Sequence, residues 1–225
     1  MTKIRDIVKQ EIPFDFFVEW NKGLQYAYIL AEDHVKGRGL EQPRIKNLLP
    51  YTYTQHVEQK LKEIAGKFSC FEIEEVKTET GYNFIILRTD SIILTQKSIG
   101  SSGSLVEPSI YRTSLARGNS IYCDNSTGYL FPLDPMKSDN TKEKIYGILT
   151  HNRASVFTKE GQIFSNLAFP DPSFDSYIDN IDLFEWCKSA GYIESADRVI
   201  DEAVVAEIQE KVIPRLKKAS KAEEM

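Results

Sequence analysis

One histidine of this 225-residue chain, His151, lies between polar neighbours and is the first candidate for acid–base chemistry. His151 follows a short apolar run and precedes Asn152 and Arg153. Imidazole exchanges protons near neutral pH, so His151 is a candidate catalytic acid or base. Asn152 would orient the ring and Arg153 would stabilise an anion. Because no nucleophile lies at a matching spacing, we favour the alternative interpretation, a polar turn at the end of a strand.

A segment rich in glycine and serine supplies the second candidate site. Residues 100–104 read Gly-Ser-Ser-Gly-Ser, and the N–H groups and hydroxyls of such a segment can converge on an anion. The candidate anion-binding residues are Lys97, Ser101, Ser102, Ser104, Arg112 and Arg117, with Arg153 beyond them. The chain has neither a Gly-x-x-x-x-Gly-Lys-Ser/Thr nor a Gly-x-Gly-x-x-Gly pattern. A flexible segment without a ligand is therefore the alternative.

Two further patterns are typical of metal or thiol chemistry. Glu75-Val76-Lys77 matches half of a nuclease motif, but Glu72 and Glu74 lie on the same strand, so no second carboxylate is expected from a neighbouring strand. Cysteines and histidines do not occur at the spacing of two to four residues that zinc sites use. They are Cys70, Cys123, Cys187, His34, His56 and His151. We expect no metal, no cofactor and no nucleophilic cysteine, and Cys123 is the one thiol worth testing.

The elements that would position these residues begin with helices over residues 1–67. An apolar stripe predicts a helix over about 14–35, which ends at Gly37 and Gly39. Pro43 and Pro50 predict a connecting segment, and the capping-box spacing of Thr52 and Gln55 predicts a second long helix. Aromatic residues concentrate here, both on the stripe and off it: Phe14, Phe16, Phe17, Trp20, Tyr26 and Tyr28.

Alternating apolar residues predict strands over residues 68–169. Strands are expected near 71–74, 83–88 and 92–95, and the short turns between them favour an antiparallel meander. Residues 98–119 look irregular, and strands are expected again at 120–123, 129–133 and 145–150. Lys159-Glu160-Gly161 then predicts a hairpin between 155–158 and 162–169. Pro170 and Pro172 should close the sheet region.

Residues 170–225 return to helix and carry an acidic face. Asp182 has N-cap spacing ahead of a short helix that Gly191 would end, and a last helix is expected over about 197–218. Residues 167–210 hold eleven acidic side chains against Lys188 and Arg198. Such a face repels nucleic acid. Helices, then strands, then helices predict one α+β domain over 1–225, with a central antiparallel sheet of a meander plus a hairpin.

Two functions are compatible with these patterns. In the first, a non-catalytic regulatory protein binds a protein partner through the aromatic N-terminal helix patch and the acidic C-terminal face. In the second, an enzyme or sensor acts on a phosphate-bearing ligand, a nucleotide or nucleic acid, through residues 97–119 and His151. The discriminating observation is whether Lys97, Arg112, Arg117 and His151 converge on one pocket.

Composition limits the cellular compartments and partners that we expect for this protein. The net charge is −5, and no stretch approaches the ~18 uninterrupted apolar residues of a membrane span. The first residues lack the apolar run of a secretory signal, and three scattered cysteines do not form a disulfide framework. We expect a cytoplasmic protein that binds a protein partner, with a homodimer as one form, no membrane association, and nucleic acid as a less favoured partner.

Overall fold

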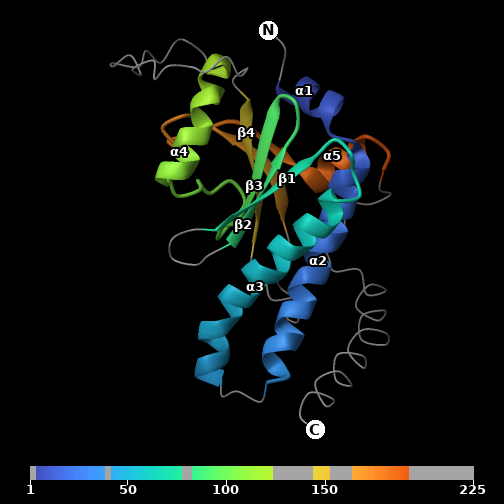
Figure 1. Ribbon diagram of the computed structural model, residues 1–225, viewed down its shortest axis with the longest axis vertical. Helices are drawn as coiled ribbons and strands as arrows, with labels where there is room; N and C mark the ends of the chain where they lie inside the picture. The colour runs from blue at the N-terminus through green and yellow to red at the C-terminus, as the bar shows by residue number, and fades with distance from the viewer. Residues whose placement is uncertain (1–3, 39–41, 78–82, 124–143, 153–163, 193–225) are drawn as a thin grey trace.

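The computed structural model describes residues 4–38, 42–77, 83–123, 144–152 and 164–192. Its helices are α1 (Ile4–Glu11), α2 (Phe14–Lys36), α3 (Gln42–Ala65), α4 (Ile110–Ala116), the 3-10 helix η1 (Arg117–Tyr122) and α5 (Leu183–Ser189). Its strands are β1 (Glu72–Lys77), β2 (Asn83–Arg88), β3 (Ile92–Ser98), β4 (Ile145–His151), β5 (Ser165–Pro170) and β6 (Tyr177–Asp182). The α+β fold predicted from the sequence is confirmed (Figure 1).

Helix α2 forms where the apolar stripe predicts it and packs along α3 (Figure 1). It starts after Pro13 and ends at Gly37, whose N–H donates to the Asp33 carbonyl at 2.8 Å. Gly23 sits where the two helices meet, and a Cβ there would overlap Ile64 Cδ1. The absence of a side chain at Gly23 thus allows the close approach of α3.

Helix α3 is longer than the prolines predict. The connecting segment expected between Pro43 and Pro50 is instead the first part of the helix, which begins at Gln42. Pro43 lies in the first turn of the helix. N–H groups in that turn have no intrahelical acceptor, so a proline there costs no hydrogen bond. Pro50 lies inside the helix, and the Thr54 hydroxyl donates to its carbonyl at 3.0 Å. Thr52 caps nothing: its hydroxyl donates back to the Leu48 carbonyl at 3.1 Å.

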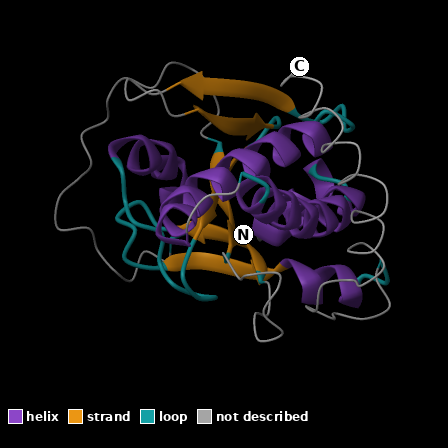
Figure 2. Cartoon of the chain, turned by 90° about the horizontal axis from the view of Figure 1, so that it is seen from below, coloured by secondary structure: helices purple, strands orange, loops and turns teal. Residues whose placement is uncertain are grey.

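The six strands form one sheet in the order β1-β2-β3-β4-β5-β6. Four neighbouring pairs are antiparallel, but β3 and β4 are parallel, so the sheet is mixed rather than wholly antiparallel. The crossover between them includes α4 and η1, where the sequence suggested an irregular segment and then a strand at 120–123. Figure 2 shows strands on both sides of the central helices, as a strongly twisted sheet requires.

The C-terminal part of the sheet extends beyond the predicted end. β5 stops at Pro170, as proline predicts, but β6 then adds a sixth strand at the edge. Asp182 caps α5 as predicted, because its carboxylate accepts from the N–H groups of Phe184 and Glu185 at 3.0 and 3.1 Å. Gly191 follows the helix with φ +76°. The predicted elements at 129–133, 155–158 and 197–218 lie outside the described residues.

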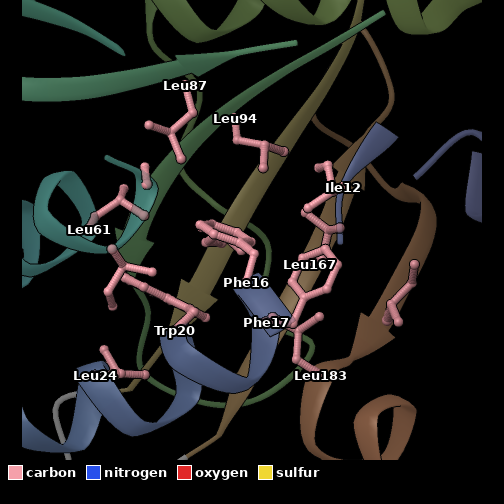
Figure 3. Packing of buried hydrophobic residues seen from close by; sticks show 14 of the residues in the cluster. Ile12, Phe16, Phe17, Trp20, Leu24, Leu61, Leu87, Leu94, Leu167 and Leu183 are labelled. Carbon is pink, nitrogen blue, oxygen red and sulfur yellow. The ribbon is translucent and has the colours of Figure 1, made fainter. Parts of the chain in front are cut away.

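The main core lies between the sheet and helices α1, α2, α3 and α5. Phe16, Phe17 and Trp20 project from α2 towards leucines of the strands (Figure 3). Adjacent residues of β2 and β3 alternate between this core and a second cluster around Ile86, Ile93 and Tyr146, which α4 covers on the opposite face. Both faces of the middle strands are therefore buried.

The aromatic N-terminal patch is largely core rather than surface. Phe16, Phe17, Trp20 and Tyr28 are each 0% exposed. Phe16, which falls off the main stripe, packs against Phe71 with tilted rings whose centroids lie 4.7 Å apart. The off-stripe residues Phe14 and Phe16 pack within the chain, because α2 contacts both α3 and α5 and shares the main core cluster with the strands. These four side chains present no surface to a partner.

Candidate functional site

Strands β2 and β3 separate soon after the turn that joins them. Their ladder pairs Arg88 with Ile93 and Leu87 with Leu94 and goes no further. Continuing that register would place Ile85 opposite Gln96. Instead, the Glu58 side chain of α3 occupies the opening, and its Oε2 accepts from the Ile85 N–H at 2.8 Å. A carboxylate thus takes the place of a strand partner.

Glu58 is the end of a buried hydrogen-bond network. Its Oε1 accepts from Gln96 Nε2 at 2.6 Å, so the Gln96 Oε1 atom faces His151 Nε2 and accepts from it at 2.7 Å. His151 Nδ1 is then left to accept from the Tyr28 hydroxyl at 2.6 Å. Gln96 and His151 are 7% and 2% exposed. The network joins α2, α3, β3 and β4 at one point.

Burial controls the electrostatics of this network. It raises the pKa of Glu58 from 4.5 to about 7, although the hydrogen bonds from Gln96 and Ile85 and the more distant charge of Arg112 act in the opposite direction. Burial also raises the pKa of the neighbouring Tyr146 to about 12, and its hydroxyl bonds to Thr95 Oγ1 at 2.7 Å. Near pH 7, Glu58 therefore exchanges between its charged and neutral forms.

A cavity of about 420 Å³ opens over Glu58, and we call it the fork cavity. Its inner wall holds Glu58, Gln96 and His151, and two cationic side chains, Lys97 and Arg112, also line it. Rings and hydroxyls complete the lining: Tyr28, Tyr53, Phe84, Tyr111, Thr54, Thr95, Ser98 and Ser109, with Ile110. The volume lies within the ~300–1,000 Å³ typical of ligand pockets.

The topology explains why these side chains meet. Gln96, Lys97 and Ser98 end β3, and His151 ends β4. Because the two strands are parallel, with Ser98 opposite His151, their carboxyl ends lie side by side at the same end of the sheet. Ligands of α/β sheets commonly bind at such an end, where connections diverge. The mixed topology therefore brings together residues that lie more than fifty positions apart.

Helix α4 brings Arg112 to the fork cavity. Ser109 caps the helix, and its hydroxyl accepts from the Arg112 N–H at 3.3 Å. Arg112 Nη1 donates to the Glu107 carbonyl at 3.4 Å, while the Tyr111 ring packs against Phe84 with centroids 5.1 Å apart. The cation is thus held at the cavity by its own segment and by an aromatic contact with β2.

The structure brings together three of the sequence candidates and separates the others. Lys97, Arg112 and His151 line the fork cavity. Arg117 does not line it, because it lies in η1 beyond the end of α4, where it is exposed. Arg153 lies outside the described residues. The convergence on one pocket therefore holds for three of the four residues that we set as the discriminating group.

The glycine- and serine-rich segment folds as an anchored turn beside the cavity and does not line it. Ser101 and Ser104 bond to each other through their hydroxyls at 2.7 Å, and Gly103 has φ +82°. The Ser102 hydroxyl accepts from Asn166 Nδ2 at 3.1 Å, and the Ser104 carbonyl accepts from the Tyr177 hydroxyl at 2.8 Å. These contacts tie the segment to β5 and β6, and none of its three serines is among the residues that line the cavity.

The metal and thiol candidates lie elsewhere. Glu75 pairs with Lys62 of α3 on edge strand β1. Burial raises the pKa of Cys187 to about 11 and also raises that of Cys70, while the Cys123 thiol contacts the Asn119 carbonyl at 3.7 Å. Within the described ranges, no group of three or more His, Cys, Asp or Glu side chains could hold a metal.

Sequence reasoning missed a contact between two histidines and missed most of the inner wall. His34 Nδ1 and His56 Nε2 lie 3.2 Å apart across α2 and α3, a pairing that sequence spacing does not reveal. Glu58 borders the apolar face of its helix between Val57 and Leu61, and it is 7% exposed. A carboxylate beside an apolar stripe is the one signal by which the sequence could have indicated this buried polar site.

Across the ranges that the structure describes, no helix is both long enough and apolar enough to cross a membrane. Comparison with protein family models, with curated proteins and with solved structures found no match to this chain. The fork cavity is therefore the feature from which a function can be inferred.

Proposed function

We propose that this protein binds a small phosphate-bearing organic molecule, of the size of a mononucleotide, in the fork cavity. The single observation that carries the proposal is that Lys97 and Arg112, from β3 and α4, line one cavity with the buried Glu58–Gln96–His151 network. Two cations beside an enclosed surface suit a phosphate, since arginine binds it through paired N–H groups and lysine adds a point charge.

The rest of the lining supports an organic ligand rather than a bare ion. Tyr53, Phe84 and Tyr111 offer ring faces and edges against which a planar group can stack. Proteins that bind single-stranded nucleic acid combine aromatic stacking with cations and need no glycine-rich motif. The same combination suits a phosphate-bearing ligand in a chain that has no such motif.

The network supports binding more than catalysis. Both ring nitrogens of His151 already bond within the protein, to Tyr28 and Gln96, and the ring is 2% exposed. A general base must reach the proton that it removes. His151 therefore acts as a positioning residue for Gln96, and we infer a ligand sensor rather than an enzyme.

The protein-partner hypothesis draws less support from the described residues. Four aromatic side chains of its N-terminal patch are buried, and residues 193–225 of its acidic face lie outside the described ranges. None of the large apolar side chains that are exposed in the described ranges belongs to α2, and they are Tyr51, Leu105, Ile110, Ile121 and Tyr192. Tyr192 nevertheless stacks on Phe14, the first residue of α2, with ring centroids 5.1 Å apart. Ile110, which is 95% exposed, borders the fork cavity itself.

Isothermal titration calorimetry with AMP and CMP tests the proposal. Arg112→Ala should weaken binding of both nucleotides about tenfold, because it removes charge-assisted hydrogen bonds to the phosphate. Arg117→Ala is the matched control, since Arg117 is an exposed cation nearby in sequence that does not line the cavity. Circular dichroism establishes that each variant is folded. Absence of nucleotide binding, or equal loss in both variants, contradicts the proposal.

A further inference from the structure

We propose that the ligand presents an exocyclic amino group of its base to the Glu58 carboxylate while its phosphate lies against Lys97 and Arg112. This inference rests on the proposed function and specifies it, because it selects among phosphate-bearing molecules. It favours nucleotides whose base carries an amino group over those with a carbonyl at the same ring position.

Glu58 has fewer hydrogen-bond partners than a buried carboxylate can take. This side chain is 7% exposed and accepts two hydrogen bonds, from Gln96 Nε2 and the Ile85 N–H, both of them neutral donors. None of the ion pairs in the described part of the chain includes Glu58. A buried carboxylate is costly without a cation or further donors, so a ligand that supplies donors gains by replacing lost water.

Glu58 can still accept further hydrogen bonds. A carboxylate offers about four acceptor sites on its two oxygens, and each oxygen here uses one of them. Glu58 also lines the fork cavity. Its remaining acceptor capacity is therefore available to a ligand without breaking the bonds to Gln96 and Ile85.

The acceptor and the cations belong to opposite faces of β3. Gln96 and Lys97 are successive residues of this strand, so their side chains leave it on opposite faces. Gln96 bonds to Glu58 of α3, whereas Lys97 shares its face with Thr95, which bonds to Tyr146 of the cluster that α4 covers. A ligand with an amino group at one end and an anion at the other matches this division.

Glu58 would discriminate between ligands that place an amino group against it and ligands that place a carbonyl there. A ring carbonyl placed against Glu58 would set two acceptors against each other, whereas an amino group donates to the carboxylate. A site built to accept from a ligand N–H rejects the analogue without it, because a buried acceptor is then left unpaired. Glu58 is accordingly a specificity-determining residue.

Matched nucleotide pairs provide the test. CMP and AMP carry an exocyclic amino group beside a bare ring nitrogen, whereas UMP and IMP carry a carbonyl beside a ring N–H. The phosphate is the same within each pair, so its contribution cancels. At pH 8, calorimetry should give about tenfold tighter binding for CMP over UMP and for AMP over IMP. Glu58→Gln offers an amide in place of the carboxylate and should reduce both ratios to near one.

The outcomes separate the two proposals. If all four nucleotides bind equally to the wild-type protein and Arg112→Ala weakens them together, the donor inference is wrong while the phosphate site stands. If none binds, both proposals are wrong. Because the wild-type ratios alone decide the inference, it stays testable even if Glu58→Gln does not fold.

Discussion

The Ile85 backbone N–H donates to Glu58 Oε2 at 2.8 Å, in the place where the ladder between β2 and β3 would have continued. A side chain of α3 thus completes the sheet where the two strands part. The same carboxylate accepts from Gln96 of β3, so it bridges both strands and lines the cavity that their separation leaves. One residue serves both the fold and the proposed site.

This bridging role predicts a large loss of stability in Glu58→Ala. The substitution leaves the Ile85 N–H and the Gln96 amide without their acceptor, and we expect a loss of about 2–4 kcal/mol in the free energy of unfolding. Denaturant titration measures it. Glu63→Ala is the control, because Glu63 is an exposed carboxylate of the same helix. Equal effects of the two substitutions would argue against the bridge.

The raised pKa of Glu58 predicts a specific pH dependence of stability. Its pKa is about 7 in the folded protein and near 4.5 in the unfolded chain. Between these values the folded state keeps a proton that the unfolded chain has released, so this contribution to stability falls as the pH rises through the window. We expect a loss of about 3 kcal/mol between pH 4.5 and 8.

The comparison with Glu58→Gln isolates this contribution, since glutamine does not titrate. Urea unfolding of both proteins across that range should show that the difference in unfolding free energy changes with pH in favour of the variant. A difference that stays constant with pH would mean that Glu58 does not titrate in this window.

Ligand discrimination should follow the same titration. Protonated Glu58 loses part of its capacity to accept, so the CMP/UMP affinity ratio should rise from pH 6 to pH 8. The ionisation of the phosphate affects both nucleotides alike and cancels in the ratio. The charged and titratable groups that line the cavity with Glu58 are Lys97, Arg112, His151, Tyr28, Tyr53 and Tyr111. A ratio that falls with pH would contradict this role of the carboxylate.

Tyr28 is expected to stabilise the network from the core side. Tyr28→Phe removes the buried hydrogen bond between the Tyr28 hydroxyl and His151 Nδ1, whose atoms lie 2.6 Å apart, at a cost of about 1–3 kcal/mol. Tyr26→Phe serves as the control, since Tyr26 lies beside Lys60 on another face of α2. Thermal unfolding of the two variants measures the difference, and equal melting temperatures would show that the buried bond contributes nothing.

Gly147 tests the packing of the parallel strands. A Cβ at this position of β4 would lie 2.9 Å from Phe169 Cε1 and 3.0 Å from Leu94 Cδ2, so Gly147→Ala should cost about 1–3 kcal/mol. Gly100→Ala is the control, because a Cβ there meets nothing within 4 Å. If chemical denaturation gives the two variants the same stability, β4 is not packed as described.

Local signals predicted much of the fold. The apolar stripe of α2 and the cap at Asp182 are set by neighbours within one or two turns, and both formed as expected. Pro50 misled the prediction because packing of α3 along α2 overrides a single lost hydrogen bond. The parallel pairing of β3 with β4 depends on which strands meet after a long crossover, and no local pattern encodes it.

The candidate site divides in the same way. Lys97, Arg112 and His151 were identified by residue type near strand ends and in a basic segment, but their convergence depends on the crossover. Glu58 and Gln96 escaped notice because each looks like an ordinary exposed residue in its own segment. Their burial depends on the separation of β2 from β3, which is a property of the whole sheet.

The most direct test of the fork cavity is a crystal structure of the protein soaked with CMP. We expect density for the phosphate within hydrogen-bond distance of the Arg112 side chain and density for the base with its amino group towards Glu58. Nucleotide density at another surface, or an empty cavity at a concentration that saturates binding in solution, would contradict it.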